Sequence, residues 1–591
     1  DAILTMDKFS NSLPVAIASI GSSKITLLVG SAITVGADAT IPDNIILWFV
    51  GPGKLFVNSG KVLTVNSPSQ VLAHTQQQVF DGTGTVSFTN GGIVSPGWWG
   101  FSSGGTAAAN ADAYNACTAS LTATGGAIVI PPTGAAHQVD DTLTHPAKPM
   151  SVIGAHPELS IIESTATASL KHGLTFTRSH HVRNLTIKTS ASLASNYDMY
   201  GVRMDLDGVT VSGGNQAVKW ESVKVRGFNN SFYCDGGDAY NVDRLYFNDL
   251  DAQCSGPAST YIGSCLYINR VTQVYGTHSQ FDQNSTGEHA IYCFGSKNLV
   301  FDGFKIRNFD KGTAQAIKVV GNGITPDDDQ AYPTWSIRNM DIADGLNGIL
   351  CGIYGTETLE ALTVENCKFV DVDTSAAILG CVYLSAAGTS NIRTLRVSGI
   401  STRNCLYQGV HVATGASATM GPVSIRDCKG YNWSTTSAGT YTWFGTSGTG
   451  TFGPITLEGI EADGNSKGRT ILSSSGQAST ISRIRYSGLK EVNTTNMGRP
   501  ISLPEADATP SLAIGNWFVQ PNTGAQNITA YDNLEANQTY YIRFSTANTT
   551  LIDGANLQLA GSTNYNPPAN TFMTFYCSDG TALYEVSRSV N

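Results

Sequence analysis

The chain has 591 residues, a formal net charge of −10, 62 glycines and only 14% charged residues. The low charge and high glycine content disfavour a coiled coil, and 41% hydrophobic with 9% aromatic residues supply the core that a disordered chain lacks. Acidic residues outnumber basic ones by 45 to 35, whereas nucleic-acid binders need a basic surface to replace phosphate counterions, so no nucleic-acid partner is predicted.

The first part of the chain, residues 1–100, is predicted to be a β-rich region that leads into the rest of the fold. Between Ile25 and Phe88, short apolar runs of strand length end at Gly, Pro, Asn or Asp. The clearest predicted strands are Ile25–Val29, Ile45–Val50, Lys54–Val57 and Val62–Val65. Asp1–Ser10 lacks the basic n-region and apolar h-region of a signal peptide, so no signal peptide is predicted.

A helix is predicted over Thr106–Thr124, which is rich in alanine and is followed by Gly125 and Gly126. Its larger apolar side chains recur at helical spacing, at Tyr114, Cys117 and Leu121. Ala127–Ile130 follows directly as a predicted strand that is ended by two prolines.

From residue 150 to residue 495 the chain repeats a loose unit of strands and turns. In each unit, one strand contains a triplet whose outer two residues are apolar and whose middle residue usually is not. The triplets are Val202–Met204, Phe232–Cys234, Leu266–Ile268, Ile291–Cys293, Ile317–Val319, Ile349–Cys351, Val382–Leu384 and Val410–Val412. Their spacing of about 25 to 34 residues predicts one coil of a parallel β-helix per unit, and the consensus of leucine-rich repeats or propellers is absent.

The pattern changes after Ile501–Pro504, where strands are separated by Asn, Gly and Pro turns. The predicted strands are Tyr540–Phe544, Asn556–Leu559, Phe572–Phe575 and Leu583–Ser587. They indicate a separate antiparallel β-sandwich over residues 501–591, and its expected role, trimerisation or carbohydrate binding, is what the resemblance described below implies. The fold class is therefore all-β, with residues 101–500 forming the β-helix between the N-terminal region and the sandwich.

The eleven cysteines are scattered, with no CxxC pair and no zinc-type spacing. They are predicted to be small buried side chains of a protein assembled in a reducing compartment. We predict no metal site and no cofactor. No apolar run approaches about 18 residues, so no membrane insertion is predicted.

Three stretches give the sequence a resemblance to bacteriophage tailspikes of the pectate-lyase-like superfamily. Val79–Val86 followed by Trp98–Gly100 resembles the approach to the β-helix in such spikes, and Gly125–Pro132 resembles the first coil after their N-terminal cap. The segment Asn556–Leu559 with Tyr584–Arg588 resembles a small sandwich that closes many spike trimers. One departure is clear, because Ser102–Ala107 replaces the acidic segment that usually precedes the cap helix, and any role of those aspartates is lost.

The resemblance implies a right-handed parallel β-helix in a homotrimer that binds and cuts a bacterial surface polysaccharide, either the O-antigen of lipopolysaccharide or a capsule. It also implies a place in the virion, on the phage tail or baseplate, through an N-terminal segment that is not evident in this sequence. Such a protein is assembled in the host cytoplasm and acts at the host cell surface during attachment. The resemblance does not imply which sugar or which bond is involved.

The middle residues of the triplets form one outward column along the predicted β-helix. The column contains Arg203, Tyr233, Tyr267, Tyr292, Lys318, Leu350, Tyr383 and His411. With about 4.8 Å per coil, Tyr233 to His411 spans roughly 29 Å, a length that suits several sugars in a row. Tyrosine rings lie well against the apolar faces of sugars, although tyrosines on an outer sheet also stack along it without any ligand. Tyr332 and Trp335, in a long insertion over Gly321–Trp335, are expected to wall this groove.

Within the column, Tyr292 and Lys318 are neighbours on adjacent coils, and Glu288 and His289 lie in the turn before the Tyr292 strand. Cutting a uronic-acid polymer by β-elimination needs a cation for the substrate carboxylate, a base and an acid. Lys318 is predicted to supply the cation, His289 or Tyr292 the base, and Tyr292 or Glu288 the acid. A lysine beside a tyrosine is expected to lower the pKa of the phenol. The alternative is an ordinary hydrogen-bonded surface cluster.

Hydrolysis would instead need two carboxylates, about 5 to 5.5 Å apart in a retaining enzyme. Asp205 and Asp235 occupy matching outward positions on adjacent coils, and Asp371 with Asp373, in a turn before the Tyr383 strand, form another pair. Acidic residues at turns more often accept hydrogen bonds from the backbone. The run Asp327–Asp329 is expected to be a solvated acidic loop.

The sequence thus favours a polysaccharide lyase, because the centre of the column holds tyrosine, lysine and histidine rather than carboxylates. Two alternatives remain open. One is an endo-glycosidase that uses Asp205 and Asp235, and the other is a receptor-binding spike that holds the polysaccharide without cutting it.

Overall fold

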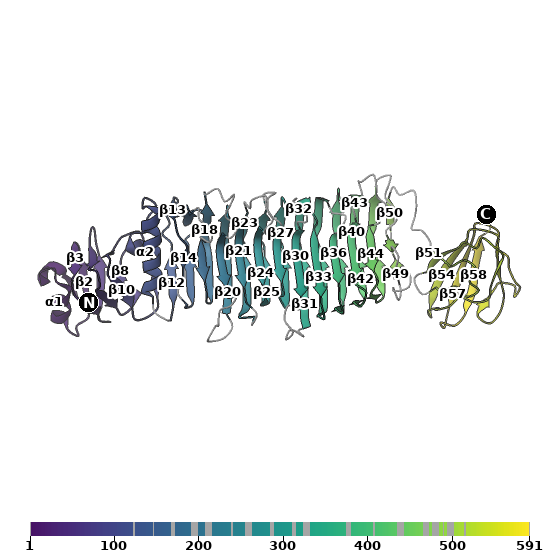
Figure 1. Ribbon diagram of the computed structural model, residues 1–591, viewed down its shortest axis with the longest axis horizontal. Helices are drawn as coiled ribbons and strands as arrows, with labels where there is room; N and C mark the ends of the chain where they lie inside the picture. Colours follow the sequence, from purple (N-terminus) through teal and green to yellow (C-terminus); the bar gives the residue numbers. More distant parts are fainter. Residues whose placement is uncertain are drawn as a thin grey trace. The chain divides into compact units, whose positions relative to one another are not determined.

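The computed structural model describes residues 2–589 with internal gaps, and these residues form two compact units. One unit contains residues 1–320 and 339–346, and the other contains residues 321–338 and 347–591. The gaps are residues 122–123, 146, 167–171, 191–198, 207–215, 238–239, 255–262, 284–288, 310–314, 323–330, 374–379, 406–407, 434–442, 465–471, 475–483, 488–489, 493–500 and 513–515. Each unit is dominated by β-strands that pair in parallel (Figure 1).

The N-terminal β region is itself a short three-sided parallel coil. Its strands are β2 (Ile25–Val29), β3 (Ala32–Val35), β4 (Ala39–Ile41), β5 (Ile45–Phe49), β6 (Lys54–Val57), β7 (Val62–Val65), β8 (Val71–Leu72), β9 (Phe80–Gly82) and β10 (Thr85–Phe88). They form three separate parallel sheets, β2-β5-β8, β3-β6-β9 and β4-β7-β10, with the strand β1 (Ala2–Thr5) added beside β2. The four strands predicted here are confirmed within a residue, whereas their winding into coils was not predicted.

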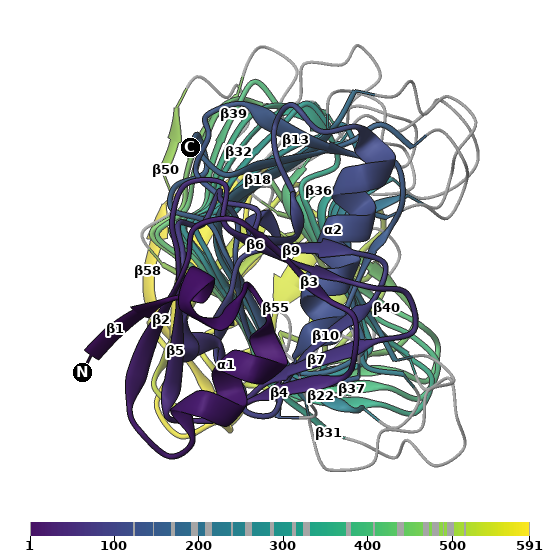
Figure 2. The same cartoon turned by 90° about the vertical axis from the view of Figure 1, so that its left-hand side faces the viewer.

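The predicted helix is confirmed as α2 (Ala107–Ser120), which contacts the strands β13 (Ala136–Val139) and β14 (Leu143–Thr144) (Figure 1 and Figure 2). Thr106 is its N-cap, with the side-chain oxygen accepting a hydrogen bond from Ala109 N. Tyr114, Cys117 and Leu121 are all buried, as the helical spacing indicated. Asn110 Nδ2 donates to Gln138 O at 2.9 Å, so the helix is tied to the first coils by a buried amide.

The coils after α2 confirm the parallel β-helix in the first unit. One of its sheets, which we call the site sheet, contains β14, β17 (Leu174–Phe176), β19 (Tyr200–Asp205), β21 (Asn230–Asp235), β24 (Ser264–Asn269), β27 (His289–Phe294) and β30 (Gln315–Asn322). Their Cα partners put Arg203, Tyr233, Tyr267, Tyr292 and Lys318 in one continuous row. The apolar neighbours of these residues are buried, so the period-2 alternation gave the correct register.

In the first unit, the part of each coil that lies outside the site sheet has one bend. The long strand β18 (His180–Thr189) pairs with two shorter strands of the preceding coil, β15 (Met150–Ile153) and β16 (Ile161–Ser164). The long strand β20 (Gln216–Arg226) pairs with two shorter strands of the next coil, β22 (Val242–Asn248) and β23 (Asp251–Gln253). A residue with positive φ lies at the bend in each coil: Asn184, Ser222, Asp249, His278 and Gly303. Such left-handed corners favour Gly and Asn and tolerate Asp.

The second unit continues with coils of the same kind. Its strands β33 (Ile349–Tyr354), β36 (Gly380–Ala386) and β40 (Gln408–Thr414) pair in parallel and align Leu350, Tyr383 and His411. The prediction of a long insertion over Gly321–Trp335 needs correction at its end. Tyr332 and Trp335 belong to the strand β31 (Ala331–Arg338), which pairs in parallel with β34 (Thr358–Glu365), and Asp327–Asp329 lies outside the described residues.

The C-terminal region has a core of its own, which includes Phe518, Ile542, Phe544, Met573 and Phe575. Its sheet has the order β51 (Ile501–Ser502), β52 (Trp517–Gln520), β54 (Gln538–Phe544), β57 (Thr571–Cys577), β58 (Leu583–Ser589) and β56 (Leu557–Gln558). The predicted antiparallel pairing holds for β54 with β57 and for β57 with β58. The prediction is wrong for β52 with β54 and β56 with β58, which are parallel. The long connection between β52 and β54 allows the chain to cross back and run in the same direction, and β56 and β58 are separated in the chain by β57.

All eleven cysteine thiols are buried, as predicted from their scatter. Among the described residues, no helix is long and apolar enough to cross a bilayer.

Candidate functional site

The N-terminal part of the outward column is held by Arg203. Its guanidinium forms an ion pair with Asp205 and lies 3.1 Å from His172 Nε2. The guanidinium also lies over the rings of Tyr200 and Tyr233, at 5.4 and 5.9 Å from their centroids. Burial, helped by the nearby Arg203 charge, lowers the pKa of His172 to about 3. His172 is therefore a neutral hydrogen-bond partner that fixes the arginine.

The tyrosines of the column stack on one another along the site sheet. Ring centroids are 4.7 Å apart for Tyr200 and Tyr233, and 4.9 Å for Tyr233 and Tyr267, whose planes differ by only 8°. Tyr267 and Tyr292 meet edge to face at 5.3 Å. The faces that Tyr233 and Tyr267 turn toward each other are thus occupied, which leaves their ring edges for contact with a ligand. Burial raises the pKa of both phenols, so they are neutral hydrogen-bond donors at neutral pH.

Tyr292, His289 and Lys318 come together at the C-terminal end of this stack, and we call them the Tyr292 cluster. The Lys318 ammonium lies 5.1 Å from the centroid of the Tyr292 ring and 3.5 Å from His289 Nε2. The rings of His289 and Tyr292 are 5.3 Å apart. The prediction that Lys318 lies beside Tyr292 is therefore confirmed, and His289 joins them from the start of strand β27 rather than from a turn.

The hydrogen bonds of His289 define what its ring can offer. The residue is only 1% exposed, and its Nδ1 accepts a hydrogen bond from Gln315 N at 3.2 Å. A neutral imidazole with Nδ1 as acceptor carries its proton on Nε2, the atom that faces Lys318. Two donors, Nε2–H of His289 and the Lys318 ammonium, therefore point into the same space, an arrangement that suits an anionic oxygen. Glu288 lies outside the described residues.

Asp205 and Asp235 are Cα partners on adjacent coils, as predicted. Asp205 is paired with Arg203. Asp235 accepts hydrogen bonds from the Tyr233 hydroxyl at 3.1 Å, from Asn269 Nδ2 at 2.8 Å and from Gly237 N at 2.8 Å. Burial raises the pKa of Asp235, the nearby Asp205 charge adds to this, and these hydrogen bonds oppose it. Asp235 is only 4% exposed, and this geometry makes it a fixed support for Tyr233.

Two predicted substrate-binding residues of the second unit are not available to a ligand. His411 is 2% exposed, with Nδ1 held by Gln408 Oε1 and Nε2 lying 2.7 Å from Ser447 Oγ. Trp335 is fully buried and packs edge to face with Tyr332. Both predictions are wrong because neighbouring side chains of the second unit cover these rings. Tyr383 is half-buried and stacks on the His411 ring with centroids 5.3 Å apart.

The second carboxylate pair also differs from its prediction. Asp371 and Asp373 lie in strand β35 (Lys368–Asp373), not in a turn. Asp371 has a positive φ of 52° and accepts a hydrogen bond from Asn404 Nδ2 at 2.8 Å. It is a corner residue of its coil, and the structure gives no side-chain placement for Asp373.

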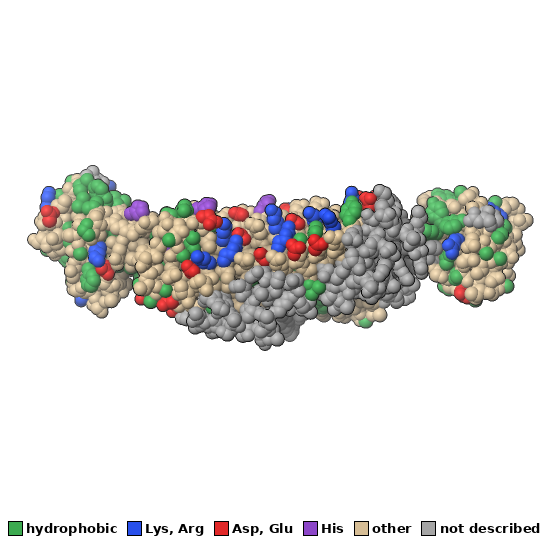
Figure 3. Space-filling view, turned by 90° about the horizontal axis from the view of Figure 1, so that it is seen from above, with side chains coloured by type: hydrophobic (Ala, Val, Ile, Leu, Met, Phe, Trp, Pro, Cys, Tyr) green, Lys and Arg blue, Asp and Glu red, His purple; other side chains and the backbone are tan. Residues whose placement is uncertain are grey.

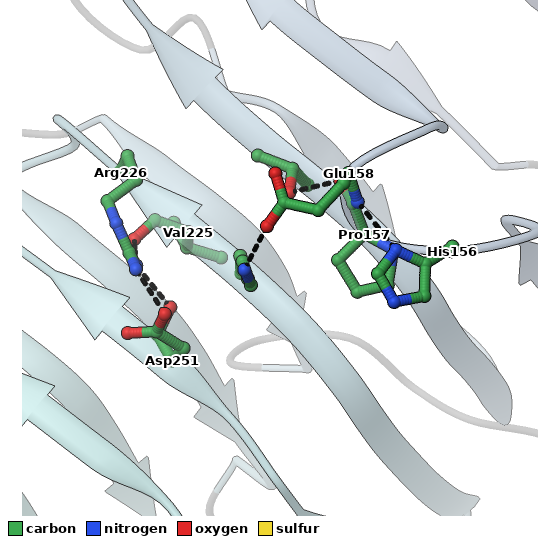
Figure 4. Close-up of polar contacts among 8 residues, drawn as sticks. His156, Pro157, Glu158, Val225, Arg226 and Asp251 are labelled. Atoms are coloured by element: carbon green, nitrogen blue, oxygen red, sulfur yellow. Dashed lines mark hydrogen bonds and ion pairs between the residues drawn. The ribbon is translucent and has the colours of Figure 1, made fainter. Parts of the chain in front are cut away.

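On a second polar surface of the first unit, basic and acidic side chains form ion pairs with one another. Figure 3 shows Lys and Arg side chains interleaved with Asp and Glu on one face. Arg226 pairs with Asp251 and donates to the carbonyls of Val225 and Asp251, and the Glu158 carboxylate pairs with a lysine nearby (Figure 4). Arg307 repeats the pattern with Asp341 at 2.7 Å. These cations therefore have anionic partners within the same face.

Tyr200, His172 and Asn269 belong to the site and were not predicted from the sequence. Tyr200 begins the Arg203 strand, but it lies three residues before Arg203, so strict alternation would place it on the opposite face. His172 and Asn269 act through hydrogen bonds between coils, which a single strand's pattern does not reveal. Among the residues with described placement, no group of three or more His, Cys, Asp or Glu side chains is arranged to hold a metal ion.

No protein-family model matches the chain, and no curated protein sequence matches it. Among solved structures, the crystal structure of tailspike protein 3 of bacteriophage CBA120 is similar, with a TM-score of 0.34 and 12% sequence identity. The similarity covers 76% of this chain and 66% of that chain, so this chain spans just under two thirds of that tailspike's length. A likeness of this extent does not assign the chain to a family.

Proposed function

We propose that the chain is a phage tailspike, present on the virion as a homotrimer, that binds and depolymerises a bacterial surface polysaccharide during host attachment. The polymer is the O-antigen of lipopolysaccharide or a capsule, and it is cut by β-elimination beside a uronic acid. The observation that carries this proposal is the convergence of Lys318 and His289 beside Tyr292, at the end of a row of stacked tyrosines. The motifs Val79–Val86 and Gly125–Pro132 resemble segments of phage tailspikes, and they support the proposal that the chain is a tailspike.

In the proposed reaction, the Lys318 ammonium holds the carboxylate of the uronic acid, and the buried His289 ring, 3.5 Å from the ammonium, positions Lys318. The contact of Lys318 with the carboxylate favours the negative charge that develops when the neighbouring carbon loses its proton. Tyr292 is the proposed base and acid, because its ring lies against both groups and its hydroxyl is the remaining proton carrier of the described cluster. The Lys318 charge also favours the phenolate that must form if Tyr292 takes the proton.

The elimination balances without any further reactant. Tyr292, which has first lost its phenol proton to water, acts as a phenolate and removes the proton from the ring carbon beside the carboxylate, and the electron pair of that C–H bond becomes a new carbon–carbon double bond. The bond from the next ring carbon to the glycosidic oxygen breaks, and that oxygen takes the proton back from the Tyr292 hydroxyl. The products are a new chain end on one side and an unsaturated uronic acid on the other.

The rest of the column is proposed to hold the sugars on the N-terminal side of the cut. Tyr233 and Tyr267 offer ring edges, and Arg203 offers a cation whose position is fixed by His172 and Asp205. Tyr383, in the second unit, stays a proposed contact. Stacking along the sheet does not exclude a contact with sugars, since the rings of Tyr233 and Tyr267 remain partly exposed.

The reaction products test the proposal. The wild-type chain is incubated with a panel of purified acidic capsular and O-antigen polysaccharides, and the products are followed by near-ultraviolet absorption and by a reducing-end assay. A lyase produces both an absorbing double bond and new reducing ends. Reducing ends without absorption identify a hydrolase, and the absence of both on a polymer that the chain binds identifies a non-cleaving receptor-binding spike.

The hydrolase alternative has one observation in its favour. Asp205 and Asp235 are neighbours whose environments differ, with Asp205 beside an arginine and the pKa of Asp235 raised by burial, and such a split is typical of an acid and a nucleophile. Against this role, the Asp235 carboxylate is buried and already accepts hydrogen bonds from three donors. The lyase therefore remains the first proposal.

A further inference from the structure

The C-terminal sheet has one apolar face in the core and a second, aromatic face toward solvent. Tyr540, Ile542 and Phe544 of β54 are buried, whereas the alternate residues Tyr541 and Arg543 are exposed. On β57, Met573, Phe575 and Cys577 are buried, and Phe572, Thr574 and Tyr576 face the other way. The outward residues of four neighbouring strands therefore share one surface, which we call the aromatic face.

The strand register arranges these outward residues in three rows. The first row is Thr539, Tyr576 and Tyr584; the second is Trp517, Tyr541, Thr574 and Ser587; the third is Val519, Arg543, Phe572 and Ser589. Neighbours within a row are about 4.8 Å apart, and successive rows are about 7 Å apart. Trp517 and Phe572 also approach each other, with ring centroids at 6.3 Å. Five aromatic side chains thus occupy a small, nearly continuous platform.

The chemistry of the platform differs from that of a subunit interface. Its largest exposed rings, Tyr541 and Tyr576, are 41% and 37% exposed, and both carry a hydroxyl at the solvent end. Threonines, serines and one guanidinium lie between the rings, where an obligate interface favours continuous apolar side chains. Rings that supply apolar faces beside closely spaced hydrogen-bonding groups match the alternation of apolar C–H faces and hydroxyls on a sugar.

The charge of the aromatic face favours an anionic ligand. The whole chain has a net charge of −10, yet none of the outward positions in the three rows carries an acidic side chain, and Arg543 contributes a cation. Glu585, the nearest acidic residue on β58, has a 2% exposed side chain and is paired with Arg588. An acidic polymer therefore meets no repulsion on this face and gains one ion pair.

We propose that the aromatic face is a second, non-catalytic binding site for an acidic polysaccharide, in which Tyr541, Tyr576 and Trp517 contact sugar rings and Arg543 contacts a carboxylate. The choice of an acidic polysaccharide rests on the proposed function of the Tyr292 cluster. A second contact with the same long polymer raises the effective concentration of the chain at the cell surface without taking part in the cut.

The test uses the full-length chain and compares the double variant Tyr541→Ala/Tyr576→Ala with Tyr431→Ala, a matched control. Tyr431 is 38% exposed and lies on strand β43 (Lys429–Trp433), which belongs neither to the site sheet nor to the C-terminal sheet. Binding is measured by biolayer interferometry on the immobilised panel of acidic capsular and O-antigen polysaccharides, with dextran as the neutral polymer. Cleavage of short soluble fragments of the same polymers is measured in parallel.

We expect the double variant to bind the acidic polymer roughly tenfold more weakly, because two rings that lie against the apolar faces of sugars are lost. Arg543→Gln should weaken binding and reduce its dependence on salt. Tyr431→Ala should bind like the wild type, and all variants should cut short fragments at the wild-type rate. The single variants Tyr541→Thr and Tyr576→Thr, which keep strand-forming side chains, give the same comparison if the double variant is unstable.

Equal affinity of the double variant and the wild type overturns the inference, as does a wild-type chain that binds none of the acidic polymers. A change of oligomeric state in the variants, seen by light scattering, also overturns it, because the face would then lie between copies of the chain. Binding that depends on the aromatic face without any cleavage by the wild type refutes the proposed lyase and leaves the second site standing.

Discussion

Acid is expected to loosen the first coils of the β-helix, because four histidines are buried there in neutral form. His137, His145, His172 and His180 are each at most 5% exposed. His145 and His180 stack on opposite sides of Phe176, each with ring centroids 3.9 Å away. Burial lowers the pKa of His137 and His145 to about 4 and that of His172 and His180 to about 3.

The direction of the effect follows from where each proton binds. In the unfolded chain these imidazoles take up a proton near pH 6.5, whereas in the folded chain they do so only near pH 3 to 4. Between these values the unfolded chain binds more protons, so stability is full above pH 6.5 and falls as the pH falls toward 4. From pH 7 to pH 5 the loss is about 2 kcal/mol for each histidine, or about 8 kcal/mol if all four titrate in one unfolding step.

His137 is the sharpest probe of this effect. Neither of its ring nitrogens has a hydrogen-bond partner in the described structure, and its ring stacks on Phe101 with centroids 4.5 Å apart. His137→Leu removes one titrating group and two unsatisfied buried nitrogens, so it should stabilise the first coils at pH 7 and more strongly at pH 5. Phe101→Leu is the matched control, because it changes the same stack without changing any titration.

The assay is hydrogen exchange of peptides covering α2 and β13, followed by mass spectrometry at pH 7 and pH 5 after correction for the intrinsic exchange rate. The difference in local opening free energy between the two pH values should shrink by about 2 kcal/mol in His137→Leu. In Phe101→Leu the difference should equal that of the wild type. An unchanged pH difference in His137→Leu would refute the reasoning, because His137 would then not be buried in neutral form.

Two further predictions concern the carboxylates and the core. Asp205→Asn should keep cleavage within a few-fold of the wild-type rate, measured as the initial rate of product formation, because its proposed role is to position Arg203; loss of roughly a hundredfold or more would favour hydrolysis. Trp220→Ala should cost about 3 to 5 kcal/mol in denaturant unfolding, since the indole is fully buried, packs on Phe232 at 5.2 Å and donates to His180 Nε2 at 2.9 Å. A cost below about 1 kcal/mol would contradict this packing.

The register of the coils was predictable because the signal is local. A strand with one face in the core must alternate, and a slip by one residue would turn each apolar triplet outward. This is why Tyr233, Tyr267 and Tyr292 could be aligned from the sequence, and the Cα pairing confirms the alignment. The bends were readable in principle, because residues with left-handed backbone, such as Asn184 and Asp249, recur between the two strands of each coil.

The short N-terminal coils were predicted only as separate strands. Their turns are brief and their strands have few residues, so the periodicity of each strand is visible while the repeat of the coil is weak. The parallel pairing of β2 with β5, or of β6 with β9, depends on which strands meet in space. That contact is non-local, and strand propensity carries no information about it.

The positions of the candidate site residues could be predicted from the sequence, whereas the chemical role of each residue was harder to predict. Lys318 and Tyr292 follow from register alone, whereas the donor role of His289 depends on a backbone hydrogen bond from the next coil. His411 and Trp335 failed as predicted contacts because neighbouring side chains bury them. Exposure of a residue on an outer column is set by what packs beside it, and a pattern of alternation does not specify that.

The most direct test of the account is the rate of polysaccharide cleavage by variants of the Tyr292 cluster. Tyr292→Phe should slow cleavage by roughly 100- to 10,000-fold through loss of the proton carrier. Lys318→Ala should slow it by roughly 10- to 150-fold, the value of about 1.5 to 3 kcal/mol for a hydrogen bond to a charged group. Lys305→Ala removes a matched exposed lysine from another face and should leave the rate unchanged. If Tyr292→Phe and Lys318→Ala keep their oligomeric state and cleave at the wild-type rate, the cluster is not the catalytic site.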